Sequence, residues 1–178
     1  MSLAAQIRPE MTMEQIMDIA PAAQRALFQR YHIGGCSSCG FQPTDTLAQV
    51  CKDHNILDLN EVVRTIVNAQ EADANLQVAC TAVKGWLDAG ESFLFLDVRM
   101  PDELALAKIA AAEALDYDNP GKYMSLPKDT KIVFHCKSGV RSLDVAAYFK
   151  GHGFTNVWSM RGGIDEWSRT IDAAVPTY

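Results

Sequence analysis

The sequence predicts a two-part α/β protein: a small all-α N-terminal domain, then an open, mainly parallel sheet with helices on both faces. Two observations lead to this prediction. The first third of the chain contains short apolar stripes at helical spacing, several of them introduced by a capping residue. From about residue 76 onward, short apolar runs alternate with helical stretches, which is typical of parallel strands covered on both sides.

Four short helices are expected between residues 11 and 68, after a flexible N-terminus over residues 1–10. Thr12 and Gln15 form a capping-box pattern, and Asp58 precedes another acidic residue at the same spacing. A further helix is expected to start near Thr44 or Asp45. The apolar stripes behind these starts contain Ile16 and Ile19; Ala23, Ala26, Leu27 and Tyr31; Leu47, Val50, Cys51 and His54; and Leu59, Val62, Val63 and Ile66.

The polar segment NAQEADAN, residues 68–75, separates the two parts. It has no bulky apolar side chain, so we expect a helix end and a linker over residues 69–75. An α/β domain over residues 76–172 and a tail over residues 173–178 are expected to follow. Within that domain the predicted strands are 93–98, 131–135 and 156–158, the predicted helices are 82–89, 101–109 and 142–151, and the glycine pair 162–163 turns into a last short helix.

Charge and hydropathy argue against several classes of function. The chain has 16 Lys plus Arg and 22 Asp plus Glu, a net charge of −6, which does not suit duplex DNA or an anionic membrane. Its longest apolar stretches fall far short of the ~18 residues that a membrane span needs. No secretory signal is visible, and five cysteines is an odd number. We therefore expect a reducing cytoplasm, where Cys-X-X-Cys spacing indicates redox or metal chemistry.

The segment HCKSGVRS, residues 135–142, lies where a buried strand is expected to lead into a helix. The backbone N–H groups of such a loop converge into an anion-binding nest. Lys137 and Arg141 add positive charge, and no acidic residue is nearer in sequence than Asp144. Such surroundings favour the thiolate of Cys136, which is the nucleophilic form. The alternative is a buried cysteine that ends a strand, but two cations and a glycine suit an anion cradle better than a core.

Several ordered motifs after residue 75 resemble those of one enzyme family. They are FLDVR at 95–99 with Pro101 and Glu103, the loop 136–141, Ala146-Ala147, GFTNV at 153–157, and GGI at 162–164 followed by Trp167. The segment from about Leu76 to Asp172 therefore resembles a single-domain rhodanese, a sulfurtransferase. The resemblance implies that Cys136 accepts a sulfane sulfur as a persulfide. It also implies a cradle made by Lys137, Ser138, Gly139, Val140, Arg141 and Ser142, in which Arg141 anchors an anionic donor such as thiosulfate.

The loop length distinguishes this interpretation from a phosphatase. Four residues separate Cys136 from Arg141, whereas related folds that hydrolyse phosphate esters have one more and hence a wider ring. Residues 107–114 depart from the family, which usually has a Gly-His-Ile turn and a Gly-Ala pair there. Asp97, Arg99 and Glu103 are interpreted mainly as structural, and an ion pair between Arg99 and Glu103 is predicted from their spacing.

The N-terminal domain has a resemblance of its own. Residues from Met11 to about Asn68 resemble, less strongly, a small helical domain found with hybrid-cluster proteins and iron–sulfur repair proteins. The motifs are the opening at 16–20, Tyr31-His32-Ile33-Gly34, the loop 36–39 and Thr46-Leu47-Ala48. This resemblance implies a redox or sulfur setting.

The pair Cys36 and Cys39 has several interpretations. It is consistent with a dithiol couple, a sulfur acceptor, half of a metal site, or two loop thiols without a role. Adding Cys51 and His54 gives a zinc-like spacing, but both share an apolar helical stripe where a buried cysteine is ordinary. We therefore assign no metal ligands and no cofactor. Cys80 is expected in the core, and His152 in an exposed turn.

Two functional hypotheses follow. In the first, the protein is a sulfurtransferase that moves sulfane sulfur from an anionic or persulfide donor, through Cys136, to a thiol or similar acceptor, which includes protein thiols. In the second, it is a sulfur-relay or redox adaptor whose helical domain receives sulfur at Cys36 and Cys39, or docks an iron–sulfur or redox partner. Metal or cluster binding at the N-terminal loop is a third possibility. Neither nucleic acid nor membrane is an expected partner.

Overall fold

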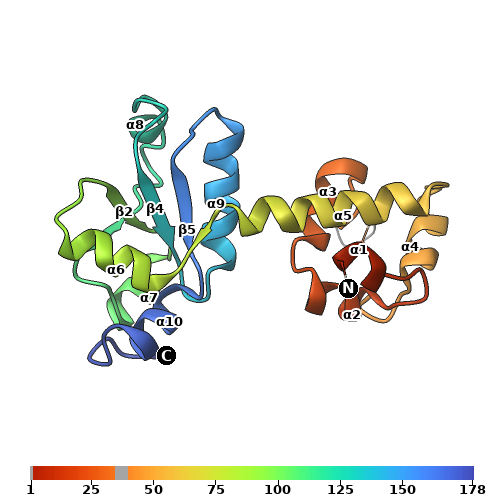
Figure 1. Ribbon diagram of the computed structural model, residues 1–178, viewed down its shortest axis with the longest axis horizontal. Helices are drawn as coiled ribbons and strands as arrows, with labels where there is room; N and C mark the ends of the chain where they lie inside the picture. The colour runs from red at the N-terminus through yellow and green to blue at the C-terminus, as the bar shows by residue number, and fades with distance from the viewer. Residues whose placement is uncertain (1, 35–39) are drawn as a thin grey trace. The chain divides into compact units, whose positions relative to one another are not determined.

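The computed structural model describes residues 2–34 and 40–178. The chain divides into two compact units, Met1–Asn75 and Leu76–Tyr178 (Figure 1). The first is helical and the second is built on a sheet of parallel strands, so the predicted fold class is confirmed. Among the described residues, no helix is both long and apolar enough to cross a lipid bilayer.

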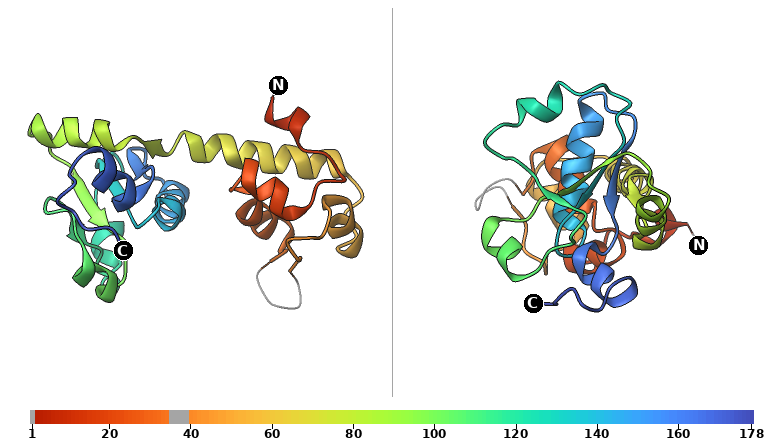
Figure 2. Two further views of the ribbon diagram at one scale, coloured as in Figure 1. Left: turned by 90° about the horizontal axis from the view of Figure 1, so that it is seen from below. Right: turned by 90° about the vertical axis from the view of Figure 1, so that its left-hand side faces the viewer.

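The helical unit is held together by one apolar core. Its helices are α1 (Leu3–Gln6), α2 (Met13–Ile19), α3 (Ala23–Tyr31), α4 (Leu47–Asp53) and α5 (Leu59–Ala74). The long helix α5 packs along α1 and α3 (Figure 2). The core is formed by fully buried side chains from all but the shortest helix and from the turn after α3, including Met13, Ile16, Leu27, Ile33, Leu47 and Ile66.

Side-chain caps start three of these helices. Thr12 forms the predicted capping box, because its Oγ1 accepts from the Gln15 N–H while the Gln15 side chain accepts from the Thr12 N–H. Asp58 caps α5 as predicted. The cap of α4 is Thr46 rather than Thr44 or Asp45. Asp45 is not the cap because its carboxylate accepts from the Gln42 N–H instead, at 2.6 Å.

The linker predicted over residues 69–75 is wrong, because α5 continues through this segment to Ala74. Two of its polar side chains contact α3 and the residue that caps it, whereas Glu71 and Asn75 are exposed. Asp73 is 4% exposed and pairs with Arg25 of α3, and Gln70 accepts from the Ala22 N–H at 3.1 Å. Gln70 and Asp73 thus bind other parts of the fold, and a single sequence does not distinguish such residues from those of a solvated linker.

The N-terminal segment is also more ordered than the predicted flexible stretch of residues 1–10. Residues 3–6 form α1, and Ile7 is buried in the helical core. The Ala48 N–H donates to the Pro9 carbonyl at 3.0 Å, which ties the segment to α4. Apolar burial and one long-range backbone hydrogen bond explain the difference.

The second unit is built on a five-stranded parallel sheet with the order β1-β5-β4-β2-β3. Its three longer strands, β2 (Leu94–Asp97), β4 (Ile132–His135) and β5 (Val157–Met160), lie where the apolar runs predicted strands. The edge strands β1 (Gln77–Val78) and β3 (Glu113–Ala114) have two residues each, and no run of that length carries a sequence signal. Because every strand pairing is parallel, the carboxyl ends of all the strands lie at the same edge of the sheet.

Helices cover both faces of this sheet, as predicted. The alternation of strand side chains separates two cores: Ile132 and Phe134 point into one, and Val133 points into the other. The first core is closed by α8 (Gly121–Met124) and α9 (Val140–Gly151), and the second by α6 (Cys80–Asp88) and α10 (Gly163–Thr170). The helix pair α6 and α10 is in direct contact.

Helix α7 (Pro101–Leu106) ends three residues before the end of the predicted helix 101–109. The Ala107 carbonyl accepts from the Arg99 guanidinium at 2.8 Å, and Ala107 itself is extended with φ −157°. Ile109 then turns into the core and is 3% exposed. A tertiary hydrogen bond and core burial thus end a helix that the alanine-rich sequence would allow to continue.

The predicted tail over residues 173–178 lies against the domain. Val175 is 8% exposed, and its carbonyl accepts from Ser168 Oγ of α10 at 2.6 Å. Tyr178 reaches the loop that follows β4. The tail is therefore part of the surroundings of that loop.

Candidate active site

The cysteine loop joins the central strand β4 to α9, and glycine lets it close tightly. Gly139 has φ +93°, a conformation that side-chain-bearing residues rarely adopt. A Cβ on Gly139 would lie 2.9 Å from the Gly162 backbone nitrogen. The loop therefore packs directly on the turn before α10, and a side chain at Gly139 would push the two apart.

Helix α10 binds the carbonyl groups of the loop. The Ile164 N–H donates to the Cys136 carbonyl at 2.8 Å, and the Asp165 N–H donates to the Lys137 carbonyl at 3.1 Å. A Cβ on Gly163 would lie 2.4 Å from both of these carbonyl oxygens. The first amides of α10 therefore fix the peptide groups that follow Cys136 and Lys137.

The Cys136 thiol lies inside this loop and is 1% exposed. The Gly139 N–H donates to Cys136 Sγ at 3.1 Å, and Ser142 Oγ donates to it at 3.5 Å. Ser159 Oγ of β5 lies 2.8 Å from Ser142 Oγ. When the Ser142 hydroxyl donates its hydrogen bond to the sulfur, the Ser159 hydroxyl donates to Ser142 Oγ. The two hydroxyl groups then form a chain of two hydrogen bonds that ends at Cys136 Sγ. Donors aimed at a sulfur atom stabilise negative charge on it.

The two cations of the loop are each paired with a carboxylate from a distant segment. Lys137 Nζ lies 3.1 Å from both carboxylate oxygens of Asp165. Arg141 binds Glu103 with two hydrogen bonds, of 2.6 and 2.7 Å. The hydrogen bonds from Arg141 lower the pKa of Glu103 to about 2, and the Glu103 carboxylate raises the pKa of Arg141. In sequence no acid was nearer than Asp144; in the fold both cations have one within hydrogen-bond reach.

The ion pair predicted between Arg99 and Glu103 is replaced by a different one. Arg99 is 1% exposed and binds both carboxylate oxygens of Asp97, with contacts from 2.6 to 3.2 Å. Its contact with Glu103 is to the main-chain oxygen, at 3.4 Å. Arg99 belongs instead to a buried group beneath the loop that also contains His135, whose Nε2 lies 3.4 Å from Asp97 Oδ2. Burial lowers the pKa of His135 to about 4.

Tyr178 joins the charged groups at the mouth of the loop. Its phenol accepts from Arg99 Nη1 at 2.8 Å and donates to Glu103 Oε1 at 3.1 Å. The Lys137 ammonium contacts the Tyr178 main-chain oxygen and lies 4.4 Å from the centroid of its ring. One aromatic side chain of the tail thereby touches groups from both sides of the cysteine loop.

The remaining residues of the predicted cradle differ in exposure. Ser138 and Val140 are exposed on the outside of the loop, whereas Gly139 and Ser142 are buried within it. Of the predicted set, the groups that contact the sulfur are the Gly139 amide and the Ser142 hydroxyl. Sequence reasoning missed Ser159, Asp165 and Tyr178. Each comes from a strand, helix or tail whose proximity to Cys136 is set by the fold and carries no local signal.

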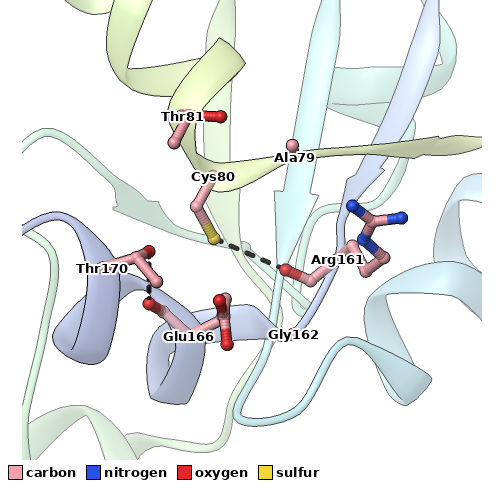
Figure 3. A pocket seen from close by; sticks show the side chains of 7 residues that line it. All are labelled: Ala79, Cys80, Thr81, Arg161, Gly162, Glu166 and Thr170. Carbon is pink, nitrogen blue, oxygen red and sulfur yellow. Dashed lines mark hydrogen bonds between the residues drawn. The ribbon is translucent and has the colours of Figure 1, made fainter.

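The cysteines outside the loop have different surroundings. Cys80 borders a cavity of about 390 Å³ next to Gly162, where its Sγ lies 3.4 Å from the Arg161 carbonyl oxygen (Figure 3). Burial raises the pKa of the Cys80 thiol to about 11, so it is protonated at neutral pH. Cys51 is 2% exposed in the helical core, and burial raises the pKa of its thiol too. Both are core residues, as predicted.

Of the other candidate metal ligands in the helical unit, the structure describes His54 but not the two cysteines of the N-terminal loop. Cys36 and Cys39 lie outside the described residues. His54 follows α4 as its C-terminal cap. Across residues 2–34 and 40–178, no three His, Cys, Asp or Glu side chains are grouped so that they could hold a metal ion.

Comparisons with known proteins give the family of the second unit. The rhodanese-like domain family matches residues 79–170. The putative sulfurtransferase YtwF of Bacillus subtilis is 35% identical over 92 residues, which cover 51% of this chain and 88% of that protein. The probable adenylyltransferase/sulfurtransferase MoeZ of Mycobacterium tuberculosis is 30% identical over 114 residues. Those residues cover 62% of this chain but 29% of that larger protein.

A solved structure shows the same fold. The reduced CoADR-RHD protein of Bacillus anthracis aligns with a TM-score of 0.50 and 20% identity, over 66% of this chain and 21% of that one. The family match spans more than half of the 178 residues and contains the whole segment from β2 to α10. The chain therefore belongs to the rhodanese-like domain family.

Proposed function

We propose that the protein is a sulfurtransferase that moves sulfane sulfur from an anionic or persulfide donor to a thiol acceptor through a persulfide on Cys136. The observation that carries the proposal is the contact between the Gly139 N–H and Cys136 Sγ, at 3.1 Å, inside a loop that begins a helix. This arrangement stabilises a thiolate and, after transfer, the negative charge of a persulfide.

The reaction consists of two substitutions at sulfur. With thiosulfate as donor, the Cys136 thiolate attacks the outer sulfur, the sulfur–sulfur bond of thiosulfate breaks, and sulfite leaves with the electron pair. An acceptor thiolate then attacks the outer sulfur of the persulfide. The bond to Cys136 breaks, its electron pair returns to Cys136 as thiolate, and the acceptor leaves as a persulfide.

The surrounding residues have separate roles in this scheme. The Gly139 amide and the Ser142 hydroxyl stabilise charge on sulfur, because both donate to Cys136 Sγ. Arg141 anchors the anionic end of the donor. Because Glu103 occupies both of its outer nitrogens, the donor must exchange with that carboxylate. Lys137 braces the loop through Asp165.

A phosphatase reaction is disfavoured by the size of the loop. Four residues separate Cys136 from Arg141, and Gly139 already packs against the Gly162 backbone. The ring of amides therefore encloses a smaller group than a phosphate with its four oxygens. A single sulfur atom fits such a cradle better.

The test is thiocyanate formation from thiosulfate and cyanide, together with the intact mass of the protein after incubation with thiosulfate. We expect wild type to be active and to gain the mass of one sulfur atom. Cys136→Ser should lose both properties, whereas Cys51→Ser, which removes another buried thiol, should retain them. The proposal fails if Cys136→Ser gains the same mass and turns over like wild type.

A sulfur relay to the helical domain is the second proposal, and it rests on the Cys36-Ser37-Ser38-Cys39 sequence between two glycines. In this scheme a thiolate of that pair takes the sulfur from the Cys136 persulfide. Peptide mapping of sulfur-loaded wild type and of a Cys36→Ser/Cys39→Ser variant tests it. Sulfur that appears first at Cys136 and later on the N-terminal pair supports a relay; sulfur that never leaves Cys136 without an added acceptor contradicts it.

The helical domain's resemblance to those of iron–sulfur repair proteins makes an iron–sulfur or redox protein a proposed partner. A reducing cytoplasm is the proposed compartment, because the nucleophile must remain a thiol between turnovers. An absorption spectrum with elemental analysis of the purified protein tests cluster binding at the N-terminal loop.

A further inference from the structure

The second unit contains a groove that the reactions of Cys136 with small molecules leave unused. It has a volume of about 320 Å³ and lies between α9 and the segment that runs from β3 through α8. Tyr123 and Phe149 are buried in it, each 4% exposed, whereas Tyr117 and Tyr148 are 53% and 57% exposed. We call it the α8–α9 groove; its apolar lining includes Leu115, Tyr117, Tyr123, Met124, Val145 and Tyr148.

Large apolar side chains are left in water around the groove and the cysteine loop. Besides the two exposed tyrosines, Val140 of the loop is 64% exposed, and Met100 is 54% exposed. The Met100 N–H donates to the same Glu103 carboxylate that binds Arg141, so Met100 borders the site as well. Exposed apolar side chains on the walls of a groove, here Tyr117 and Tyr148, are typical of an interaction site, because leaving them in water is unfavourable.

Two hydrogen bonds, one from a side chain and one within the backbone, connect the groove to the residue before Cys136. Tyr117 Oη donates to the Val98 carbonyl at 2.6 Å, and the Val98 N–H donates to the His135 carbonyl at 2.9 Å. His135 directly precedes Cys136. On the other wall, α9 begins at Val140 in the cysteine loop and presents Val145 and Tyr148 to the groove one and two turns later. The groove therefore shares its walls with the strand end and the helix that flank the cysteine loop, and Tyr117 is close enough to Cys136 for the two to interact electrostatically.

The groove carries acidic side chains, whereas the cysteine loop carries the basic side chains Lys137 and Arg141. Asp116 and Asp144 line it, and none of its lining residues is Lys, Arg or His. Asp116 is held in place because its Oδ1 accepts from the N–H groups of Asp118 and Asn119, both at 3.2 Å. Two carboxylates beside exposed tyrosine rings attract a cation and repel an anionic donor such as thiosulfate. The groove and the cradle thus suit different molecules.

We propose that the α8–α9 groove binds a segment of a protein thiol acceptor that carries both lysine or arginine and apolar side chains next to its cysteine. The apolar side chains fill the space above Tyr123 and Phe149, and the cation lies against Asp116, Asp144 and the tyrosine rings. The net charge of −6 on the whole chain adds long-range attraction for such a partner. A volume of about 320 Å³ holds one or two side chains, which is the scale of a peptide segment.

This inference rests on the proposed sulfur transfer for its chemical step. The acceptor thiolate, held beside the groove, attacks the outer sulfur of the Cys136 persulfide. A sulfur–sulfur bond forms on the acceptor, the bond to Cys136 breaks, and its electron pair returns to Cys136 as thiolate. No oxidant or reductant is consumed, because the sulfane sulfur keeps its oxidation state.

The test uses the full chain, loaded with thiosulfate, and two synthetic peptides with a central cysteine flanked by leucine and either lysine or glutamate. We expect the lysine peptide to accept sulfur with a kcat/KM about tenfold higher than the glutamate peptide. In an Asp116→Asn/Asp144→Asn variant this preference should fall to about twofold. Tyr148→Ser should lower the rate with either peptide relative to the rate with cyanide.

The matched control is Asp129→Asn, which removes an exposed carboxylate from the loop before β4, outside the groove. It should keep the preference of wild type. Binding of a labelled lysine peptide with serine in place of cysteine, followed by fluorescence anisotropy, tests the groove independently of sulfur transfer. The inference is overturned if wild type shows no preference, or if the preference and the anisotropy change persist in the double variant. If wild type forms no thiocyanate from thiosulfate and cyanide, the proposed function is overturned instead.

Discussion

The close packing of α10 on the cysteine loop leads to a quantitative prediction for Gly163→Ala. Gly163 has φ +58°, and an added Cβ would lie 2.4 Å from the carbonyl oxygens of Cys136 and Lys137. Placing alanine in the left-handed region costs about 1 kcal/mol. Overpacking against atoms that cannot rotate away costs a further 1 to 3 kcal/mol, roughly. We expect the free energy of unfolding to fall by about 2 to 4 kcal/mol in total.

Gly90→Ala is the matched control. Gly90 has a similar positive φ of +69°, but a Cβ there would meet no atom within 4 Å. It should therefore show only the conformational cost, about 1 kcal/mol. The difference between the two variants measures the contact between α10 and the loop.

Urea unfolding followed by tryptophan fluorescence is the assay, because all three tryptophans lie in the second unit and report on it alone. Sulfur loading of Cys136 is measured in parallel by intact mass. Gly163→Ala should load slowly because its Cβ displaces the carbonyls that orient the loop, whereas Gly90→Ala should load like wild type. Equal stability and equal loading of the two variants would refute the assigned role of Gly163.

Three further predictions concern charged groups. Burial lowers the pKa of His135 from 6.5 to about 4. As the pH falls, the imidazole is therefore protonated in the unfolded chain before it is protonated in the folded one. The free energy of unfolding should be highest above pH 6.5 and should fall between pH 6.5 and pH 4. The loss is at most about 3 kcal/mol, with a shallower slope for His135→Gln in urea titrations at several pH values. Glu103→Gln should lower KM for thiosulfate about threefold at unchanged kcat, because the anion no longer competes with a carboxylate for Arg141; a raised KM in steady-state kinetics would show that Glu103 positions Arg141 instead. Arg25→Ala, which leaves buried Asp73 without this partner, should destabilise the helical unit by about 3 kcal/mol in circular dichroism while thiosulfate–cyanide activity persists.

Local patterns in the chain were enough for the features that depend on neighbours in sequence. The capping box at Thr12 needs only residues three apart, and the buried strands β2 and β4 are visible as apolar runs. The cysteine loop is readable for the same reason, since Cys136, Gly139 and Ser142 lie within one strand-to-helix connection. The residue types in such a connection are therefore enough to predict its local backbone conformation.

Features that depend on distant partners were predicted poorly. The polar end of α5 has the composition of a linker, and the partner that holds it in the fold, Arg25, is far away in sequence. The early end of α7 depends on a hydrogen bond from the Arg99 side chain to the Ala107 carbonyl, which is only eight residues away but which helical periodicity does not signal. The same limit applies to the edge strands of two residues, which exist only because a longer strand lies beside them.

The sequence alone determined that a cysteine loop follows a buried strand and precedes a helix, because backbone hydrogen bonding and apolar periodicity act over a few residues. Tertiary structure decided the electrostatics around that cysteine. It brings Glu103 to Arg141 and Asp165 to Lys137, places Ser159 behind Ser142, and lays Tyr178 across the mouth of the loop. Coulomb and hydrogen-bond energies depend on distance in space, and the order of strands in the sheet sets those distances.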